Sequence, residues 1–276
     1  MSHPIPEAPP AGDGAMRRPT LHGSWPEMTY AGVLSFLRRT YTRDLTGAAV
    51  VDAGDCWLDP HNPLTIPGAI RDHARRILAS GARMLTFGGD HYITYPLLQA
   101  HAERFGAPLA LIHFDAHCDT WPDDSPESLN HGTMFYKAVR EGLIDPAHSV
   151  QVGIRTWNDD FMGVHVLDAP TVHARGADWA LQQVLRIVGD RPTYLTFDID
   201  CLDPAHAPGT GTPVAGGLSS AQALHVVRGL VPLHLIGMDV VEVSPPYDHA
   251  DITALAAAHV ACDLLCVLAA QRRARR

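Results

Sequence analysis

The fold is decided by the stretch LALIHFDAHCDT, residues 109–120. Residues 109–114 form an almost continuous apolar run, and the run is followed at once by Asp115, His117 and Asp119. A strand that is apolar on both faces is typical of a parallel sheet covered by helices on both sides. In such sheets the functional residues lie beyond the carboxyl ends of the strands, which is where these polar side chains are expected.

Three other apolar runs end in the same way. Their polar tips are Asp90-His91 after residues 84–87, Asp198 and Asp200 after residues 193–197, and Glu242 after residues 233–241. In an extended backbone every second residue faces the same side, so the residues at each of these tips should converge. The sequence therefore predicts one polar site assembled from several strand ends.

Apolar runs and helical segments alternate along the chain, which predicts an α/β fold. We expect a single domain, residues 25–276, with a mostly parallel sheet and helices on both faces, preceded by a flexible arm at residues 1–24. The expected strands are residues 48–53, 84–87, 109–114, 150–154, 193–197 and 233–243. The expected helices are residues 67–80, 92–105, 132–141, 178–188, 219–229 and 252–273.

Composition narrows the function. The 276 residues include 30 acidic and 21 basic ones, for a net charge of −9, which argues against a nucleic-acid partner and suits a cationic ligand. Hydrophobic residues make up 46 %, so disorder is excluded. Five cysteines without a C-x-x-C pair indicate a reducing compartment, and we expect a cytoplasmic protein. The apolar tract 254–270 reads as a buried helix, too short and too polar to span a membrane.

Carboxylates and histidines crowded at the strand ends would repel one another unless a cation neutralised them. There are too many of them for one ion, whereas two divalent cations sharing carboxylates would satisfy the set. Oxygen donors with a minority of imidazoles and no thiolate suit Mn²⁺ better than structural Zn²⁺. Two such ions would generate a hydroxide nucleophile, so the residues themselves predict metal-assisted hydrolysis.

Taken singly, these residues have ordinary explanations. His91 could cap the helix that begins near residue 92, and Asp198 and Asp200 could form Asx turns. Cys118 and Cys201 lie between the polar residues and are expected to be small core side chains. A metal site is favoured because polar residues of this kind follow all four apolar runs.

Five segments closely resemble the ureohydrolase (arginase/agmatinase) family, and the last two are most similar to its bacterial agmatinases. They are FGGDH (87–91), HFDAHCDT (113–120), LNHGTMF (129–135), LTFDIDCLDPAHAPGTGTP (195–213) and GMDVVEVSPPYDHADITALAAA (237–258). The resemblance implies an arginase-like three-layer α/β/α fold and a homo-oligomer, a trimer or a hexamer.

The resemblance also implies roles for individual residues. Two Mn²⁺ ions per chain would bind, the first to His91, Asp115, Asp119 and Asp198, and the second to Asp115, His117, Asp198 and Asp200. His131 would shuttle protons together with Asp119, and Glu242 would hold the guanidinium group of the substrate. The implied reaction releases urea and an amine from a guanidino compound.

The loop at residues 121–132 bears on the substrate. Asp123, Asp124 and Glu127 should repel a carboxylate and attract a terminal amine, which favours agmatine, with putrescine as the product. Guanidinobutyrate or another guanidino acid is the alternative. A deacetylase on a related fold is disfavoured by Glu242 and by the paired acidic motifs, which support two metals.

The N-terminal part departs from the family pattern, because an expected early strand, loop and helix before residues 50–55 are absent. Residues 48–53 should then pair with residues 84–87, or leave that strand at an exposed edge. His91, which follows this strand, would be the most vulnerable ligand. The departure also keeps open an inactive metal-binding relative that acts through association with an active homologue.

Overall fold

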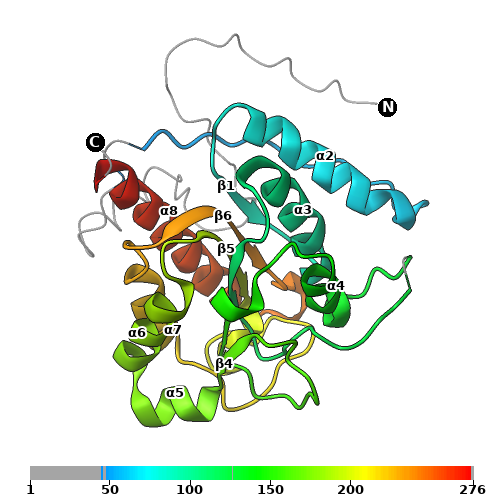
Figure 1. The fold of residues 1–276 in the computed structure, drawn as a ribbon. Coiled ribbons are helices and arrows are strands. Elements are labelled where there is room, and N and C mark those ends of the chain that lie inside the picture. Colours follow the sequence, from blue (N-terminus) through cyan, green and yellow to red (C-terminus); the bar gives the residue numbers. More distant parts are fainter. Residues whose placement is uncertain (1–44, 46–47, 126, 275–276) are drawn as a thin grey trace.

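A computed structural model describes residues 45, 48–125 and 127–274. In this part of the chain, six strands form one parallel sheet in the order β1-β6-β5-β2-β3-β4 (Figure 1). The strands are β1 Met84–Phe87, β2 Ala110–Phe114, β3 Val150–Val152, β4 His165–Leu167, β5 Pro192–Asp198 and β6 His234–Val241. The expected parallel sheet is confirmed, whereas the predicted arm at residues 1–24 lies outside the described residues.

Helices cover both faces of the sheet and complete the three layers. One layer contains α2 Ile66–Ala79, α3 Thr94–Phe105 and α4 Met134–Arg140. The other contains α5 Ala169–Arg175, α6 Ala177–Val188, α7 Ser220–Arg228 and α8 Ile252–Ala274. The sheet is therefore buried on both sides, which explains why its strands are apolar throughout.

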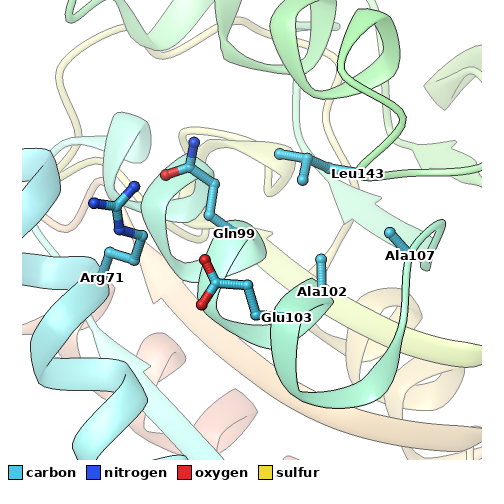
Figure 2. Close-up of a pocket in the computed structure, with 6 residues that line it drawn as sticks. All are labelled: Arg71, Gln99, Ala102, Glu103, Ala107 and Leu143. Atoms are coloured by element: carbon cyan, nitrogen blue, oxygen red, sulfur yellow. The ribbon is translucent and has the colours of Figure 1, made fainter.

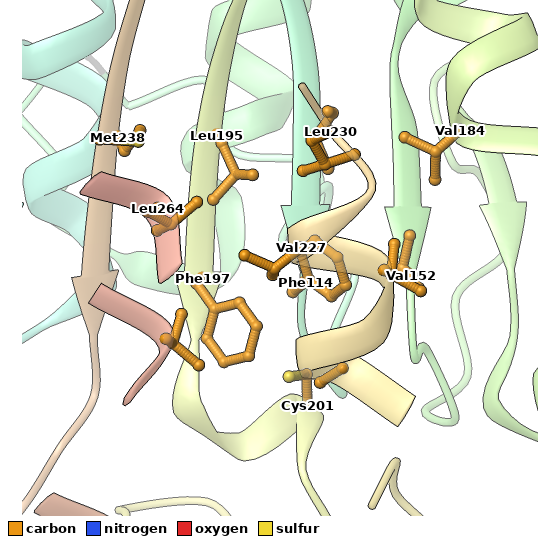
Figure 3. Close-up of a cluster of buried hydrophobic side chains, with 14 of the residues drawn as sticks. Phe114, Val152, Val184, Leu195, Phe197, Cys201, Val227, Leu230, Met238 and Leu264 are labelled. Atoms are coloured by element: carbon orange, nitrogen blue, oxygen red, sulfur yellow. The ribbon is translucent and has the colours of Figure 1, made fainter. Parts of the chain in front are cut away.

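The larger core lies between the sheet and the second helical layer. Phe114 of β2 stacks on Phe197 of β5 with ring centroids 5.0 Å apart, and both rings are fully buried. Figure 3 shows these rings facing Val227 of α7 and Leu264 of α8. This packing fixes the two central strands relative to each other, and their ends carry most of the predicted site.

The predicted helices are confirmed to within a few residues, since their end signals are strong. Ser219 and Gln222 form a complete capping box at the start of α7. Two elements were missed by the sequence analysis, β4 and α5. Three and seven residues are too short for a hydrophobic period to show.

The strand expected at residues 48–53 is wrong. These residues form no strand, and Val51 is 83 % exposed. Within the described residues, β6 is the only strand that pairs with β1, and Phe87 at the end of β1 is 66 % exposed. Residues 48–53 therefore do not pair with β1, and β1 is left at an exposed edge of the sheet, which was the second of the two expected outcomes.

Helix α8, predicted to within one residue, is longer than the apolar tract 254–270 that was judged too short to span a membrane. Its 23 residues are long and apolar enough to cross a membrane by length and composition alone, so the argument from length was wrong. However, half of its most apolar window is buried inside the protein, where Val260, Leu264 and Val267 join the core. The packing supports the interpretation of α8 as a core helix.

Gly237 in β6 allows a close approach between the sheet and α3. A Cβ atom at this position would lie 2.1 Å from Nε2 of His101, whose ring is fully buried. We expect Gly237→Ala to lower the free energy of unfolding by about 1–3 kcal/mol through overpacking, measured by urea denaturation. Gly68→Ala in α2 is the matched control, because nothing lies within 4 Å of its Cβ and stability should not fall. An unchanged free energy of unfolding in Gly237→Ala would contradict the packing argument.

Candidate metal centre

The carboxyl ends of β1, β2 and β5 bring the predicted residues together. His91 begins the short 3-10 helix after β1, residues 115–119 follow β2, Asp198 ends β5 and Asp200 lies in the next turn. Within the described residues, the ligand atoms of His91, His113, Asp115 and Asp119 all lie within 4.8 Å of one another. Those of Asp115, His117 and Asp200 form a second group with the same spacing. The two groups share Asp115 and could hold two ions side by side.

His91 presents one ring nitrogen to three carboxylates. Its Nδ1 atom lies 3.1 Å from an oxygen each of Asp115, Asp119 and Asp198, and it is buried without a hydrogen-bond partner. The other nitrogen, Nε2, lies 2.8 Å from the hydroxyl of Thr196 in β5. Such an arrangement leaves Nδ1 free to bind a metal ion, with Nε2–H as the donor to Thr196.

The backbone of His91 is held as firmly as its ring, since its N–H donates to Oε1 of Glu242 at 2.7 Å. Thr196 and Glu242 lie on or after strands of the paired side of the sheet. The expectation that the open edge at β1 makes His91 the most vulnerable ligand stays a prediction, and these two contacts argue against it.

The second group is slightly more open to solvent. Nδ1 of His117 lies 3.2 Å from Asp115 and 3.1 Å from Asp200, and its side chain is 28 % exposed. The N–H of Ala116 donates to Oδ1 of Asp200 at 3.0 Å, which joins the turn after β2 to the turn after β5.

The charges of the cluster call for a cation. Burial and the repulsion of Asp115 and Asp200 raise the pKa of Asp198 well above its usual value. Although burial lowers it, hydrogen bonds with Asp115 and Asp200 raise the pKa of His117 to about 11. Divalent cations placed among these oxygens would take over the neutralising role that protons otherwise fill.

A row of polar side chains supports the cluster from one face of the sheet. His113, Thr196, Asp239 and Thr86 are register partners on adjacent strands. Nε2 of His113 lies 2.7 Å from Asp115, while Asp239 accepts hydrogen bonds from Thr94 and Tyr194. The sequence did not predict this row as a unit, although a histidine and an aspartate inside apolar strands were its visible signal.

A third group lines the approach to the cluster. Nδ1 of His131 lies 3.0 Å from Asp90 and 3.9 Å from Glu242. The hydrogen bond that His131 donates to the carboxylate of Asp90 raises the pKa of His131, and burial raises the pKa of Glu242. These groups can exchange protons with a bound molecule and can pair with a cation.

The backbone at two site residues is strained. Asp119 and Glu242 have φ angles of 53° and 63°, in the left-handed region that favours glycine. Non-glycine residues in this region cost about 1–3 kcal/mol each, and such strain tends to concentrate at functional sites.

The acidic loop side chains already have partners. Asp124 accepts from Arg140 at 2.8 Å and from the Tyr136 hydroxyl. Asp123 accepts from the N–H of Ser125 and from the Thr133 hydroxyl. These contacts reduce the charge available to attract an amine, and the predicted role of both residues in substrate binding remains a prediction.

A separate shallow pocket lies between α2, α3 and the segment before β2. Figure 2 shows Arg71, Gln99 and Glu103 around it, together with Ala102, Ala107 and Leu143. It is at the end of the sheet where the strands begin, opposite the cluster. None of the groups of metal-capable side chains found in the described residues includes a residue of this pocket.

Comparison with known proteins identifies the family. A sequence model described as Arginase family matches residues 28–266. A protein named Agmatinase from Chromobacterium violaceum is 59 % identical over 306 aligned positions, covering 93 % of this chain and 95 % of the relative. Because the chain has 276 residues, at least 30 of those positions have no counterpart here, in line with a missing segment.

Solved structures agree. One of a hypothetical agmatinase from Burkholderia thailandensis is 70 % identical, with a TM-score of 0.80 over 83 % of this chain and 72 % of that one. Another, the proclavaminate amidino hydrolase of Streptomyces clavuligerus, is 42 % identical, with a TM-score of 0.77 over 80 % and 75 % of the two chains. With its parallel sheet and its cluster at the strand ends, the chain belongs to the arginase family and is a ureohydrolase.

Proposed function

We propose that this chain hydrolyses agmatine to urea and putrescine at a centre of two Mn²⁺ ions. The observation that carries the proposal is the buried Nδ1 of His91, which has no hydrogen-bond partner and lies 3.1 Å from three carboxylates. A buried imidazole nitrogen that faces three carboxylate oxygens and forms no hydrogen bond is placed as a metal ligand would be. The named relatives at 55–59 % identity support the reaction.

The ligand set favours manganese. Its donors are carboxylate oxygens with a minority of imidazole nitrogens, the mixture that suits Mn²⁺, and in the described residues no cysteine belongs to either group. The proposed ligands are His91, Asp115, His117, Asp119, Asp198 and Asp200. When bound, the ions would lower the pKa of a water molecule so that hydroxide is available at neutral pH.

The protein's own groups bind the substrate and move protons. Glu242, fixed by the N–H of His91, pairs with the planar guanidinium cation and orients its carbon towards the cluster. His131 is oriented by Asp90 at 3.0 Å and delivers a proton to the departing amine, with Asp119 as the second proton carrier.

The choice of agmatine rests more on the relatives than on the loop. Asp123 and Asp124 are already hydrogen-bonded, so their attraction for a terminal ammonium is reduced. Guanidinobutyrate remains the alternative substrate, and an inactive relative that binds metal remains the alternative of another class.

Urea release from a panel of guanidino compounds tests the proposal. After loading with Mn²⁺, we expect kcat/KM for agmatine to exceed that for guanidinobutyrate and arginine by about 10-fold or more, since a preference of about 1.4 kcal/mol between substrate tails is a factor of ten. Preference for guanidinobutyrate would overturn the substrate and leave the reaction class standing. Two bound ions without urea release from any compound would favour the inactive relative.

A further inference from the structure

Arg155, just after β3, makes an unusual set of hydrogen bonds. Within the described part of the chain, every hydrogen bond of its guanidinium ends on a main-chain carbonyl oxygen. The acceptors are Gly153 at 3.0 Å, Asp200 at 2.6 Å, Cys201 and Leu202 at 3.3 Å, and Val214 at 2.7 and 3.0 Å. Three of these five carbonyls belong to the turn that carries Asp200. A planar group with five fixed donors is suited to holding several carbonyls at once.

The main chain at the same position holds the other turn of the site. The N–H of Arg155 donates to the carbonyl of Ala116 at 3.0 Å, and Thr156 donates to the same oxygen through its N–H and its hydroxyl. Ala116 in turn donates to the carboxylate of Asp200. Arg155 thus lies where the turn bearing His117 meets the turn bearing Asp200.

The segment that returns past Asp200 is held as well. The two hydrogen bonds to Val214 fix a stretch in which the hydroxyl of Thr212 reaches Oδ2 of Asp200 at 3.3 Å. That oxygen also lies 3.1 Å from Nδ1 of His117. The hydrogen bonds of the guanidinium to the turn of Asp200 and to Val214 therefore bear on one pair of ligand atoms, His117 Nδ1 and Asp200 Oδ2.

We infer that Arg155 is a positioning residue for one half of the metal centre. It sets the spacing of the half formed by Asp115, His117 and Asp200. The half formed around His91 depends instead on Thr196 and Glu242, and the guanidinium makes no hydrogen bond to either. This inference rests on the proposed two-metal centre and adds a residue that acts on one of its two sites.

Arg155→Met removes all five donors, and Mn²⁺ binding is the measurement. Chain freed of metal with a chelator is titrated with Mn²⁺, and free Mn²⁺ is followed by electron paramagnetic resonance. We expect one ion to bind as in the unmodified chain and the other about 10- to 100-fold more weakly, the range found for residues that orient metal ligands. At Mn²⁺ concentrations that fill only the tighter site, Arg155→Met should also lack the resonance signature of a coupled manganese pair.

Arg155→Lys is the second variant, since it keeps the charge and three donors and should recover part of the lost affinity. Arg228→Met is the matched control. Arg228 of α7 donates a hydrogen bond to the buried Asp263 of α8 at 2.8 Å, away from the metal centre. Its replacement should lower the stability of the protein while both ions stay bound.

The outcomes separate the inference from the proposed function. Equal weakening of both ions in Arg155→Met, or two ions bound as tightly as before, would overturn the role of Arg155. An unmodified chain that binds fewer than two ions would overturn the proposed centre itself.

Discussion

Replacing Asp198 with asparagine is expected to remove the metal centre while leaving the fold in place. Oδ2 of Asp198 lies 3.1 Å from Nδ1 of His91, and Oδ1 accepts the N–H of Asp200. A neutral amide cannot serve as a shared anionic ligand, so we expect fewer than two bound Mn²⁺ ions by elemental analysis. Because the ions supply several kcal/mol to the reaction, urea release should fall by about 1,000-fold or more.

The same substitution should act in the opposite direction on the metal-free chain. Burial and neighbouring carboxylates raise the pKa of Asp198, so its charge destabilises the fold near neutral pH when no cation is bound. Asp198→Asn removes that charge and should raise the melting temperature of the chelated protein. Such a rise would show that the charge of Asp198 serves metal binding and lowers the stability of the metal-free fold.

Asp203→Asn is the matched control for both measurements. Asp203 lies five residues further along the same connection and accepts the N–H groups of Ala205, Gly216 and Gly217. Its asparagine variant should keep two ions and full activity. If Asp198→Asn also kept two ions and normal urea release, a shared ligand at this position would be ruled out.

The residues of the metal cluster were predictable because they follow directly on apolar runs, whereas His131 came from the family resemblance. Asp115, His117 and Asp119 follow a strand that no polar residue but His113 interrupts, and parallel strands end at one edge of a sheet. Their convergence therefore follows from the fold class alone. The assignment of Asp115 and Asp198 as shared ligands came from the family resemblance and still awaits its test.

What supports the site was much harder to predict. Arg155 acts on main-chain carbonyls, and a carbonyl acceptor leaves no trace in the sequence. The left-handed backbone of Asp119 and Glu242 is likewise hidden from the sequence, since glutamate does not signal it and aspartate, although enriched there, adopts it only rarely. The row of His113, Thr196 and Asp239 depends on strand register, which becomes known only when the strand order is known.

The N-terminal error has a physical cause as well. Residues 48–53 have the apolar composition of a strand, but a strand needs a neighbour for its N–H and C=O groups. In the described residues β1 pairs on one side only, with β6, and residues 48–53 remain unpaired. Composition favoured a strand, but residues 48–53 do not occupy the free edge of β1, and composition carries no information about that pairing.

Glu242→Gln should separate substrate binding from metal binding. The amide that replaces the carboxylate keeps an oxygen that can accept the N–H of His91, now 2.7 Å from Oε1, so this ligand should stay in place and both ions should remain. What is lost is the negative charge opposite the guanidinium. Breaking a partly buried charge pair costs about 2–5 kcal/mol, so kcat/KM for agmatine should fall by about 30- to several thousand-fold.

The split between the two kinetic constants and a distant control make the test of Glu242 specific. A group that orients the guanidinium for attack should lower kcat as well as raise KM, whereas one that only attracts the cation should change KM alone. Glu141→Gln removes a charge of the same kind from a residue that accepts the Tyr95 hydroxyl at 2.6 Å, and it should leave both constants unchanged. Near-normal urea release by Glu242→Gln with two ions bound would mean that another carboxylate holds the guanidinium, and Asp90, 3.0 Å from His131, would be the next residue to substitute.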